Sequence, residues 1–259
     1  MTKFSANLGF LWTELTLPEA IHAAARAGFD AVECHWPYSY RAADINAALG
    51  ATGLTMVGLN TQCGDVEAGE KGLSALPGRE PEARAAIDEA IAYAQAINTP
   101  NVHVMAGVSC GEQARQTFVD NLHYASKQAA AHGITILIEP LNHRDAPGYF
   151  LSTSAQAAEI IATVDVPNLK LMFDCYHLQI MEGNLALSLK ELLPIIGHVQ
   201  IASVPLRQEP DAGEIHYPFL FSVLSDLGYR GYVGAEYKPK ATTDEGLGWM
   251  PSSSKKQLV

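Results

Sequence analysis

The chain has 259 residues, and its composition excludes several classes of protein. Hydrophobic residues make up 48% and charged residues 17%, which is enough apolar material for a full core and too little polarity for a disordered chain. The formal net charge is −11, so a phosphate backbone would be repelled and nucleic acid is disfavoured as a partner. The expected partner is a small metabolite.

Four widely spaced cysteines, Cys34, Cys63, Cys110 and Cys175, show no CxxC spacing, which suits reduced thiols in a cytosolic enzyme. Residues 1–12 lack the pattern of a signal peptide, and no apolar run approaches the roughly 18 residues of a membrane-spanning helix. We therefore expect a cytoplasmic protein that does not bind membranes.

Short apolar runs typical of strands alternate with Ala-rich stretches of helical spacing along the chain. The predicted strands cover residues 4–8, 31–35, 55–60, 101–105, 134–139, 169–174, 198–202 and 232–236. The predicted helices cover residues 18–28, 41–53, 81–97, 111–133, 153–164, 184–196 and 217–228. This alternation, at a length near the ~250 residues typical of the fold, predicts a single α/β domain over residues 1–240, a (β/α)8 TIM barrel.

Two segments depart from this alternation. Residues 61–80 are rich in Gly and charge and are longer than ordinary connections, so we expect either a lid over the catalytic face or a tolerated insertion. Arg79 and Glu80 would latch such a lid or pair with each other. Residues 241–259 form a polar tail in which Trp249 is expected to dock on the barrel and the last residues to be mobile.

The last four predicted strands each end in a side chain that can bind a metal: Glu139, Asp174, Gln200 and Glu236. Because the carboxyl ends of barrel strands meet at one face, these side chains should converge there. Buried carboxylates that converge repel one another, and a divalent cation is the simplest remedy. Oxygen ligands with one amide favour Mg²⁺ or Mn²⁺. The plainer alternative for each residue is a helix cap or an ion pair.

The motifs around these strand ends are IEPLN (138–142), FDCYH (173–177), HVQIA (198–202) and GAEY (234–237), joined by the distinctive segments 64–80 and 176–183. Together they resemble the hydroxypyruvate isomerase family, within the xylose-isomerase-like TIM barrels. The likeness extends over nearly the whole chain. It implies that Glu139 and Glu236 are the catalytic pair as well as metal ligands, and that Asp174 and Gln200 complete the metal site.

Four further polar residues are candidates for substrate binding. The resemblance implies that His177 contacts a substrate oxygen and that Arg207 binds substrate oxygens or a carboxylate. Their alternatives are a capping role for His177 and a solvated surface charge for Arg207. His103 is either a substrate contact or a hydrogen-bonded core histidine, and Arg144 matches the family segment only in part.

The expected reaction interconverts hydroxypyruvate and tartronate semialdehyde through an enediolate, with two carboxylates moving the proton and a metal stabilising the negative charge. A 2-oxo-tetronate isomerase or a ketose 3-epimerase would use the same residues. An endonuclease IV-like phosphodiesterase and a non-catalytic scaffold are less favoured. Glycine-rich phosphate motifs are absent, so no nucleotide cofactor is expected. The chain is a possible homo-oligomer.

Overall fold

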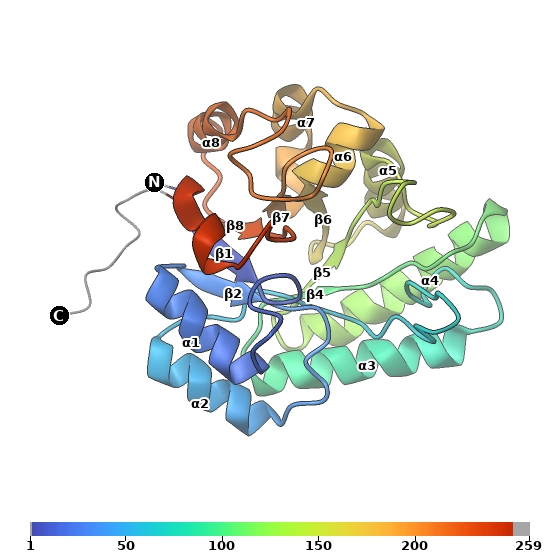
Figure 1. Ribbon diagram of the computed structural model, residues 1–259. Helices are drawn as coiled ribbons and strands as arrows, with labels where there is room; N and C mark the ends of the chain where they lie inside the picture. The colour runs from blue at the N-terminus through green and yellow to red at the C-terminus, as the bar shows by residue number, and fades with distance from the viewer. Residues whose placement is uncertain (1, 251–259) are drawn as a thin grey trace.

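The computed structural model describes residues 2–250, and eight parallel strands form its centre (Figure 1). The strands pair in the order β2-β1-β8-β7-β6-β5-β4-β3, which is their chain order read around a circle. They are β1 (Lys3–Asn7), β2 (Ala31–Glu33), β3 (Leu59–Asn60), β4 (Asn101–His103), β5 (Thr135–Ile138), β6 (Leu169–Asp174), β7 (Ile196–Ile201) and β8 (Tyr232–Ala235).

The two ends of this sheet meet between β2 and the segment that precedes β3. Val32 forms a parallel bridge with Met56, and the backbone N–H of Val57 donates to the carbonyl of Val32 at 2.7 Å. The sheet is therefore a nearly closed (β/α)8 barrel, as predicted. The third predicted strand, 55–60, is the least regular, because only its last two residues pair as a strand.

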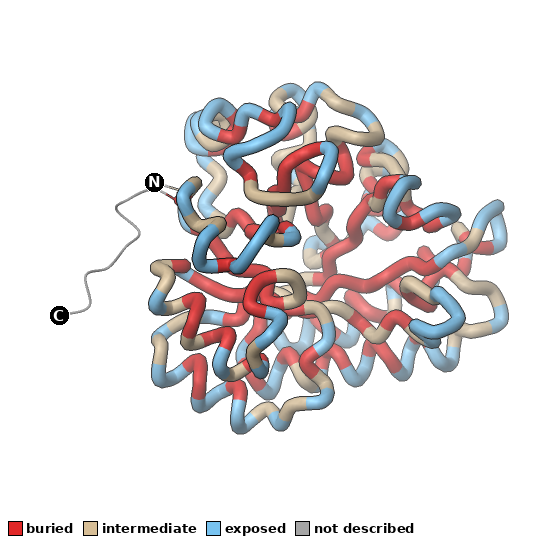
Figure 2. The backbone as a smooth tube through the Cα atoms, viewed as in Figure 1, coloured by how far each residue is buried: buried red, intermediate tan, exposed pale blue. Residues whose placement is uncertain are grey.

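Helices surround the barrel and bury one face against it, whereas the strands are buried along their length (Figures 1 and 2). They are α1 (Leu17–Ala27), α2 (Ala42–Thr52), α3 (Glu80–Ala96), α4 (Gly111–Ala130), α5 (Ser154–Val164), α6 (Cys175–Met181), α7 (Leu185–Leu192) and α8 (Tyr217–Asp226). Among residues 2–250 we find no helix with the length and apolarity to cross a membrane.

Helix α6 is an addition to the predicted elements. It begins directly after β6, and Asp174 caps it by accepting a hydrogen bond from the backbone N–H of Tyr176 at 2.8 Å. Its seven residues complete only about two turns, so the sequence offers no run of helical spacing long enough to recognise it. The cap gives Asp174 a fixed orientation at the mouth of the barrel.

The loop 61–80 follows β3 and is attached to the end of β4 by backbone hydrogen bonds. Gly72 bridges Ala106 in antiparallel fashion, and the N–H of Ala75 donates to the carbonyl of Ala106 at 2.7 Å. Arg79 does not pair with Glu80. It binds Glu70 within the loop at 2.7 Å and Glu82 on α3.

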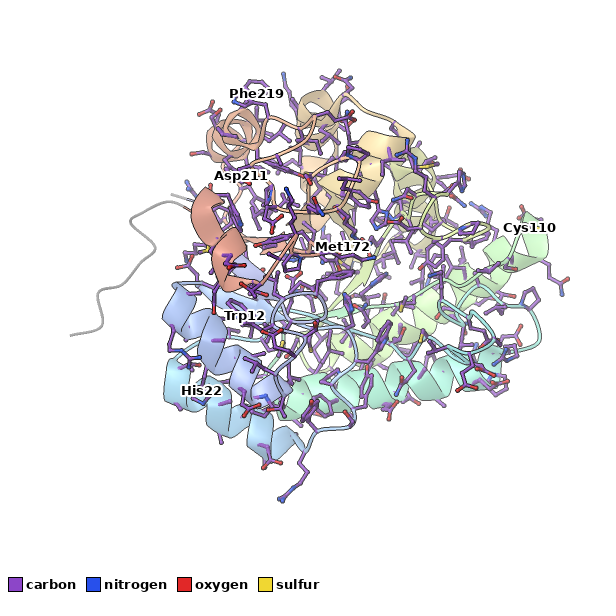
Figure 3. The ribbon with its side chains drawn as sticks, in the orientation of Figure 1. Trp12, His22, Cys110, Met172, Asp211 and Phe219 are labelled. Carbon is purple, nitrogen blue, oxygen red and sulfur yellow. The ribbon has the colours of Figure 1, made fainter. Side chains whose placement is uncertain are left out.

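The start of the tail packs on the barrel. Residues Asp244–Trp249 form a short 3-10 helix, and the Trp249 ring contacts Phe4 at a centroid distance of 5.1 Å and donates a hydrogen bond to the Tyr237 hydroxyl. The expected mobile end, residues 251–259, lies outside the described residues. Figure 3 shows Cys110 at the outer end of α4, far from Met172 in the barrel centre.

Candidate active site

Four buried side chains converge at the carboxyl ends of the strands. Glu139 follows β5, Asp174 ends β6, His177 lies on α6 and Glu236 follows β8. One possible ligand atom from each lies within 4.8 Å of all the others. Residues from separate strands meet here because the barrel brings every strand end to the same face, where such folds place their active sites.

Gln200 belongs to the same cluster through the register of the sheet. It is the direct partner of Asp174 on the neighbouring strand, and both side chains are buried. The Gln200 amide nitrogen donates to Glu33 Oε1 at 2.8 Å, which leaves the Gln200 carbonyl oxygen free. The buried Gln200 oxygen therefore has no donor among the described residues.

Three acceptor oxygens in the cluster are buried and receive no hydrogen bond from the described residues. They are Glu139 Oε1, Asp174 Oδ2 and Gln200 Oε1. Buried acceptors without donors are rare, because each one forfeits its hydrogen bonds to water. A hard cation would satisfy all three, so the residues present fit a divalent metal such as Mg²⁺ or Mn²⁺.

The electrostatics of the carboxylates reflect this lack of donors. Burial raises the pKa of Glu139 well above its usual range, and the nearby charges of Glu236 and Asp174 raise it further. Burial and Glu236 likewise raise the pKa of Asp174 to about 7. Burial also acts on Glu236, but Arg207 and His35 outweigh it and lower the pKa of that carboxyl. The metal-free cluster is therefore under electrostatic strain at Glu139 and Asp174.

Glu236 has donors on both of its oxygens. Arg207 Nη2 lies 2.6 Å from Oε2, while His35 Nε2 and Asn7 Nδ2 lie 3.0 and 2.9 Å from Oε1. The Arg207 guanidinium is stacked between the rings of Phe10 and Tyr176, at 4.8 and 5.0 Å from their centroids. These contacts place Arg207 at the site rather than on the solvated surface.

His177 is fixed in one neutral tautomer by Asn142. The Asn142 backbone N–H donates to His177 Nδ1 at 3.0 Å, so Nδ1 is unprotonated and Nε2 carries the hydrogen. Nε2 lies 3.6 Å from Asp174 Oδ2 and 3.9 Å from Glu139 Oε1. Burial and the charge of Arg207 lower the pKa of His177 well below its usual range. In this geometry His177 is a neutral hydrogen-bond donor and not a ready metal ligand.

The cluster opens into a cavity of about 120 Å³ at the mouth of the barrel. Its lining includes five charged side chains, three of them acidic and two basic, and three histidines: Glu139, Asp145, Glu236, Lys71, Arg207, His35, His103 and His177. A cavity of this size, closed below by the barrel core, suits a small polar metabolite.

The remaining two candidate substrate contacts differ in position. His103 ends β4 and lines the cavity; neither ring nitrogen has a hydrogen-bond partner within residues 2–250, and Nδ1 lies 3.6 Å from Glu139 Oε2. Burial lowers the pKa of His103 to about 4, so its ring is neutral and available to a ligand. Arg144 is exposed, and the structure does not bring it to the cavity.

Sequence reasoning missed four residues of the site: Asn7, Glu33, His35 and Lys71. Asn7 and Glu33 end β1 and β2, and His35 ends the second predicted strand, so the rule that selected Glu139 would have selected them as well. Lys71 lies in the irregular loop 61–80, where no strand end marks it. Only the folded loop brings it to the cavity.

Comparisons with known proteins agree with this architecture. A family model described as xylose isomerase-like TIM barrel matches residues 21–253. The chain is 48% identical to a 2-oxo-tetronate isomerase of Cupriavidus necator, with 96% of this chain and 98% of the relative covered. It is 41% identical to the hydroxypyruvate isomerase of Escherichia coli, with the same coverage.

Solved structures give the same picture. A protein from Brucella melitensis whose structure is titled AP endonuclease, family 2 superposes with a TM-score of 0.93 at 44% identity, covering 96% of this chain and 98% of that one. A D-psicose 3-epimerase from Clostridium cellulolyticum H10 superposes with a TM-score of 0.79 at 20% identity, covering 97% and 91%. The likeness to the epimerase extends to the fold alone.

Proposed function

The chain belongs to the xylose-isomerase-like TIM-barrel family, and from this premise we propose that it interconverts hydroxypyruvate and 2-hydroxy-3-oxopropanoate (tartronate semialdehyde) with a divalent metal. The resemblance to the hydroxypyruvate isomerase family is confirmed by relatives of 41–48% identity over almost the full length. Relatives of both names are isomerases, and the chain is accordingly an isomerase. The substrate and the metal assistance constitute the proposal.

The observation that carries the proposal is the meeting of Glu139 and Glu236 beside three oxygens without donors. Moving a carbonyl from C2 to C3 requires removal of the C3 proton, an enediolate between C2 and C3, and return of a proton to C2. The C2 oxygen gains a proton and the C3 hydroxyl loses one, so the reaction is redox-neutral overall. Two carboxylates beside one substrate can perform both transfers at carbon.

The two glutamates are prepared differently for this task. Glu236 has donors on both oxygens, which hold it ionised and fixed in position. Glu139 Oε1 accepts no hydrogen bond from the described residues, so it can face a cation while Oε2 exchanges a proton with carbon. We assign the pair to proton transfer in both directions of the reaction.

The neutral donors of the site would bind the substrate oxygens. His177 carries its hydrogen on Nε2, next to Glu139 and Asp174, where the C2 or C3 oxygen would lie. His103 also lines the cavity, and its two ring nitrogens have no partner among the described residues. Arg207 offsets the charge of Glu236 and keeps a positive group beside the developing enediolate.

Four side chains would hold the metal: Glu139, Asp174, Gln200 and Glu236. When bound, the ion would supply Lewis-acid stabilisation of the negative charge on the substrate oxygens. His177 stays outside this set, because its Nδ1 is occupied by Asn142 and its Nε2 carries hydrogen.

A 2-oxo-tetronate isomerase is the second candidate, because the 48% identical relative bears that name. Both substrates are 2-oxo acids with a hydroxyl on C3, and they differ by one hydroxymethyl group. The same residues can therefore act on either, and the size of the cavity beyond C3 decides between them. A cytoplasmic location and the absence of a nucleic-acid partner remain predictions from composition.

Exchange of carbon-bound hydrogen tests the proposal directly. Purified protein is incubated in D₂O with Mn²⁺ or Mg²⁺ and with hydroxypyruvate, 2-oxo-tetronate or neutral ketoses, and the carbon-bound protons are followed by NMR. We expect exchange and conversion with a 2-oxo acid, loss of both after chelation, and recovery on adding metal. An enzyme that exchanges no proton on any of these compounds would contradict the proposal, and full activity after chelation would contradict its metal.

A further inference from the structure

Lys71 reaches the cavity because the loop 61–80 is held closely against β4. The N–H of Gly72 donates to the Cys63 carbonyl at 2.8 Å, and Gly72 bridges Ala106. Gly72 has φ of 124°, and a Cβ at this position would lie 2.5 Å from the Met105 carbonyl oxygen. Only glycine allows this approach, and the residue before it is thereby directed to the barrel mouth.

Two cationic side chains line the cavity, and one of them is already engaged. Arg207 binds Glu236 at 2.6 Å and lies 3.6 Å from Asp145 and 3.7 Å from Asp174. Within residues 2–250, Lys71 forms no ion pair. It lines the cavity with its charge uncommitted.

The acidic residue next to Lys71 is also occupied. Glu70 receives Arg79 on one oxygen at 2.7 Å and the N–H of Asp65 on the other at 2.7 Å. The Arg79 side chain therefore neutralises Glu70 and leaves Lys71 without competition from its neighbour. A half-buried lysine beside a cavity, without an anionic partner among the described residues, is suited to an anionic ligand.

We propose that Lys71 binds the carboxylate of the substrate and makes the site selective for hydroxy-oxo acids over neutral ketoses. This inference rests on the proposed function. An anion entering a cavity lined by Glu139 and Glu236 is repelled, and a lysine at the rim offsets that repulsion with a charge-assisted hydrogen bond.

The barrel order supports this placement. The loops after β3 and β7 carry Lys71 and Arg207, and strands four places apart in an eight-stranded barrel lie on opposite sides. A substrate spanning the cavity would direct its carboxylate to the β3 side. Its C2 and C3 atoms would then lie over the glutamates that follow β5 and β8.

The test compares an acid and a neutral ketose of the same chain length. Metal-loaded wild type, Lys71→Gln and Lys71→Arg are assayed by deuterium exchange with hydroxypyruvate and with dihydroxyacetone, in which a hydroxymethyl group replaces the carboxylate. For Lys71→Gln we expect KM for hydroxypyruvate to rise about 10–100-fold with kcat little changed, because uniform binding is lost. Exchange on dihydroxyacetone should stay the same, and Lys71→Arg should recover part of the loss.

Calorimetry with glycerate gives a second readout that does not depend on turnover, because glycerate keeps the carboxylate but has no carbonyl. Its affinity should fall by a similar factor in Lys71→Gln. Lys238→Gln is the matched control: it removes the same charge from an exposed lysine that lies outside the cavity lining. This control should bind glycerate as the wild type does.

The outcomes separate the two proposals. If wild type exchanges no proton on any hydroxy-oxo acid, the proposed function is overturned and this inference falls with it. If wild type is active but Lys71→Gln keeps its KM and its glycerate affinity within twofold, the function stands and the role of Lys71 is overturned. An equal loss on hydroxypyruvate and dihydroxyacetone, or an equal loss in Lys238→Gln, also overturns it.

Discussion

Glu33 and Glu139 are buried carboxylates in one barrel, yet their surroundings are opposite. Glu33 lies inside the barrel below the mouth and accepts hydrogen bonds from four side chains: Ser5 at 2.9 Å, Asn7 at 3.2 Å, His198 at 2.7 Å and Gln200 at 2.8 Å. Glu139 lies at the mouth and accepts none from the described residues. Burial pushes the pKa of both groups upward, but His198 and Gln200 more than offset it at Glu33, whose pKa is lowered, while that of Glu139 is raised.

The difference shows that donors, and not burial, separate a carboxylate with a lowered pKa from one with a raised pKa. Glu33 orients the residues around it: it holds the Gln200 amide, and Asn7 bridges it to Glu236. The satisfied network thereby positions side chains of the unsatisfied cluster. Glu139 Oε1 has no donor among the described residues, and this unsatisfied buried acceptor lowers the stability of the fold.

Glu139→Gln gives the largest expected effect on activity. Turnover should fall about 10²–10⁴-fold, because the amide cannot accept the carbon proton. The metal-free protein should be as stable as wild type or more so, since the substitution removes a charge repelled by Glu236 and Asp174. Exchange kinetics and thermal unfolding are measured together, with the exposed Glu191→Gln as control. Wild-type turnover in Glu139→Gln would show that Glu139 does not take part in proton transfer.

Glu33→Gln should act on stability first. The substitution removes a charge that pairs with His198 and turns an amide N–H toward groups that are themselves donors. We expect a loss of about 3 kcal/mol in the free energy of unfolding, with the Glu191→Gln control within about 0.5 kcal/mol of wild type. Urea unfolding measures both. A Glu33→Gln protein of unchanged stability would show that this network is no more structural than the Glu139 cluster.

The smallest effect is a pH dependence that Asp174 gives to the metal-free protein. Its folded pKa of about 7 lies above the unfolded value near 3.9, so the folded state binds more protons and stability falls as pH rises through 7. Between pH 6 and 8 the wild type should lose about 1 kcal/mol more than Asp174→Asn, measured by thermal unfolding without metal.

Metal should cancel this loss in the wild type, because the ion replaces the proton at the carboxylate. Adding Mn²⁺ at pH 8 should therefore raise the melting temperature of the wild type more than that of Asp174→Asn. Identical pH profiles for the two proteins would mean that Asp174 is not strained in the folded state.

The barrel could be predicted in advance because its signals are local. Runs such as 134–139 and 169–174 are apolar on both faces, as parallel strands require, and each is followed by a helix of regular spacing. Residue types at strand ends then indicated Glu139 and Asp174, because the fold itself dictates where those ends lie. Helix α6 was not predicted, because a segment of seven residues is too short to show helical periodicity.

The site was predictable only where a strand end marked it. Asn7 and Glu33 are polar residues at the ends of β1 and β2, as Glu139 is at the end of a predicted strand, but they were not predicted as site residues. Arg144 was selected by its place in a motif, yet its side chain is exposed. No sequence feature indicated Lys71, because an irregular loop has no periodic pattern that predicts where its side chains point.

The sequence by itself determined the (β/α)8 class, the strands that end in side chains able to bind a metal and the excess of acidic charge, because periodicity and residue type are properties of the chain. Only the tertiary structure decided which of two buried carboxylates has its donors, which tautomer His177 adopts and which cation, Lys71 or Arg207, has no ion pair within residues 2–250. Those outcomes depend on distances between residues remote in sequence, such as Glu33 and Gln200, and only the closed barrel sets these distances.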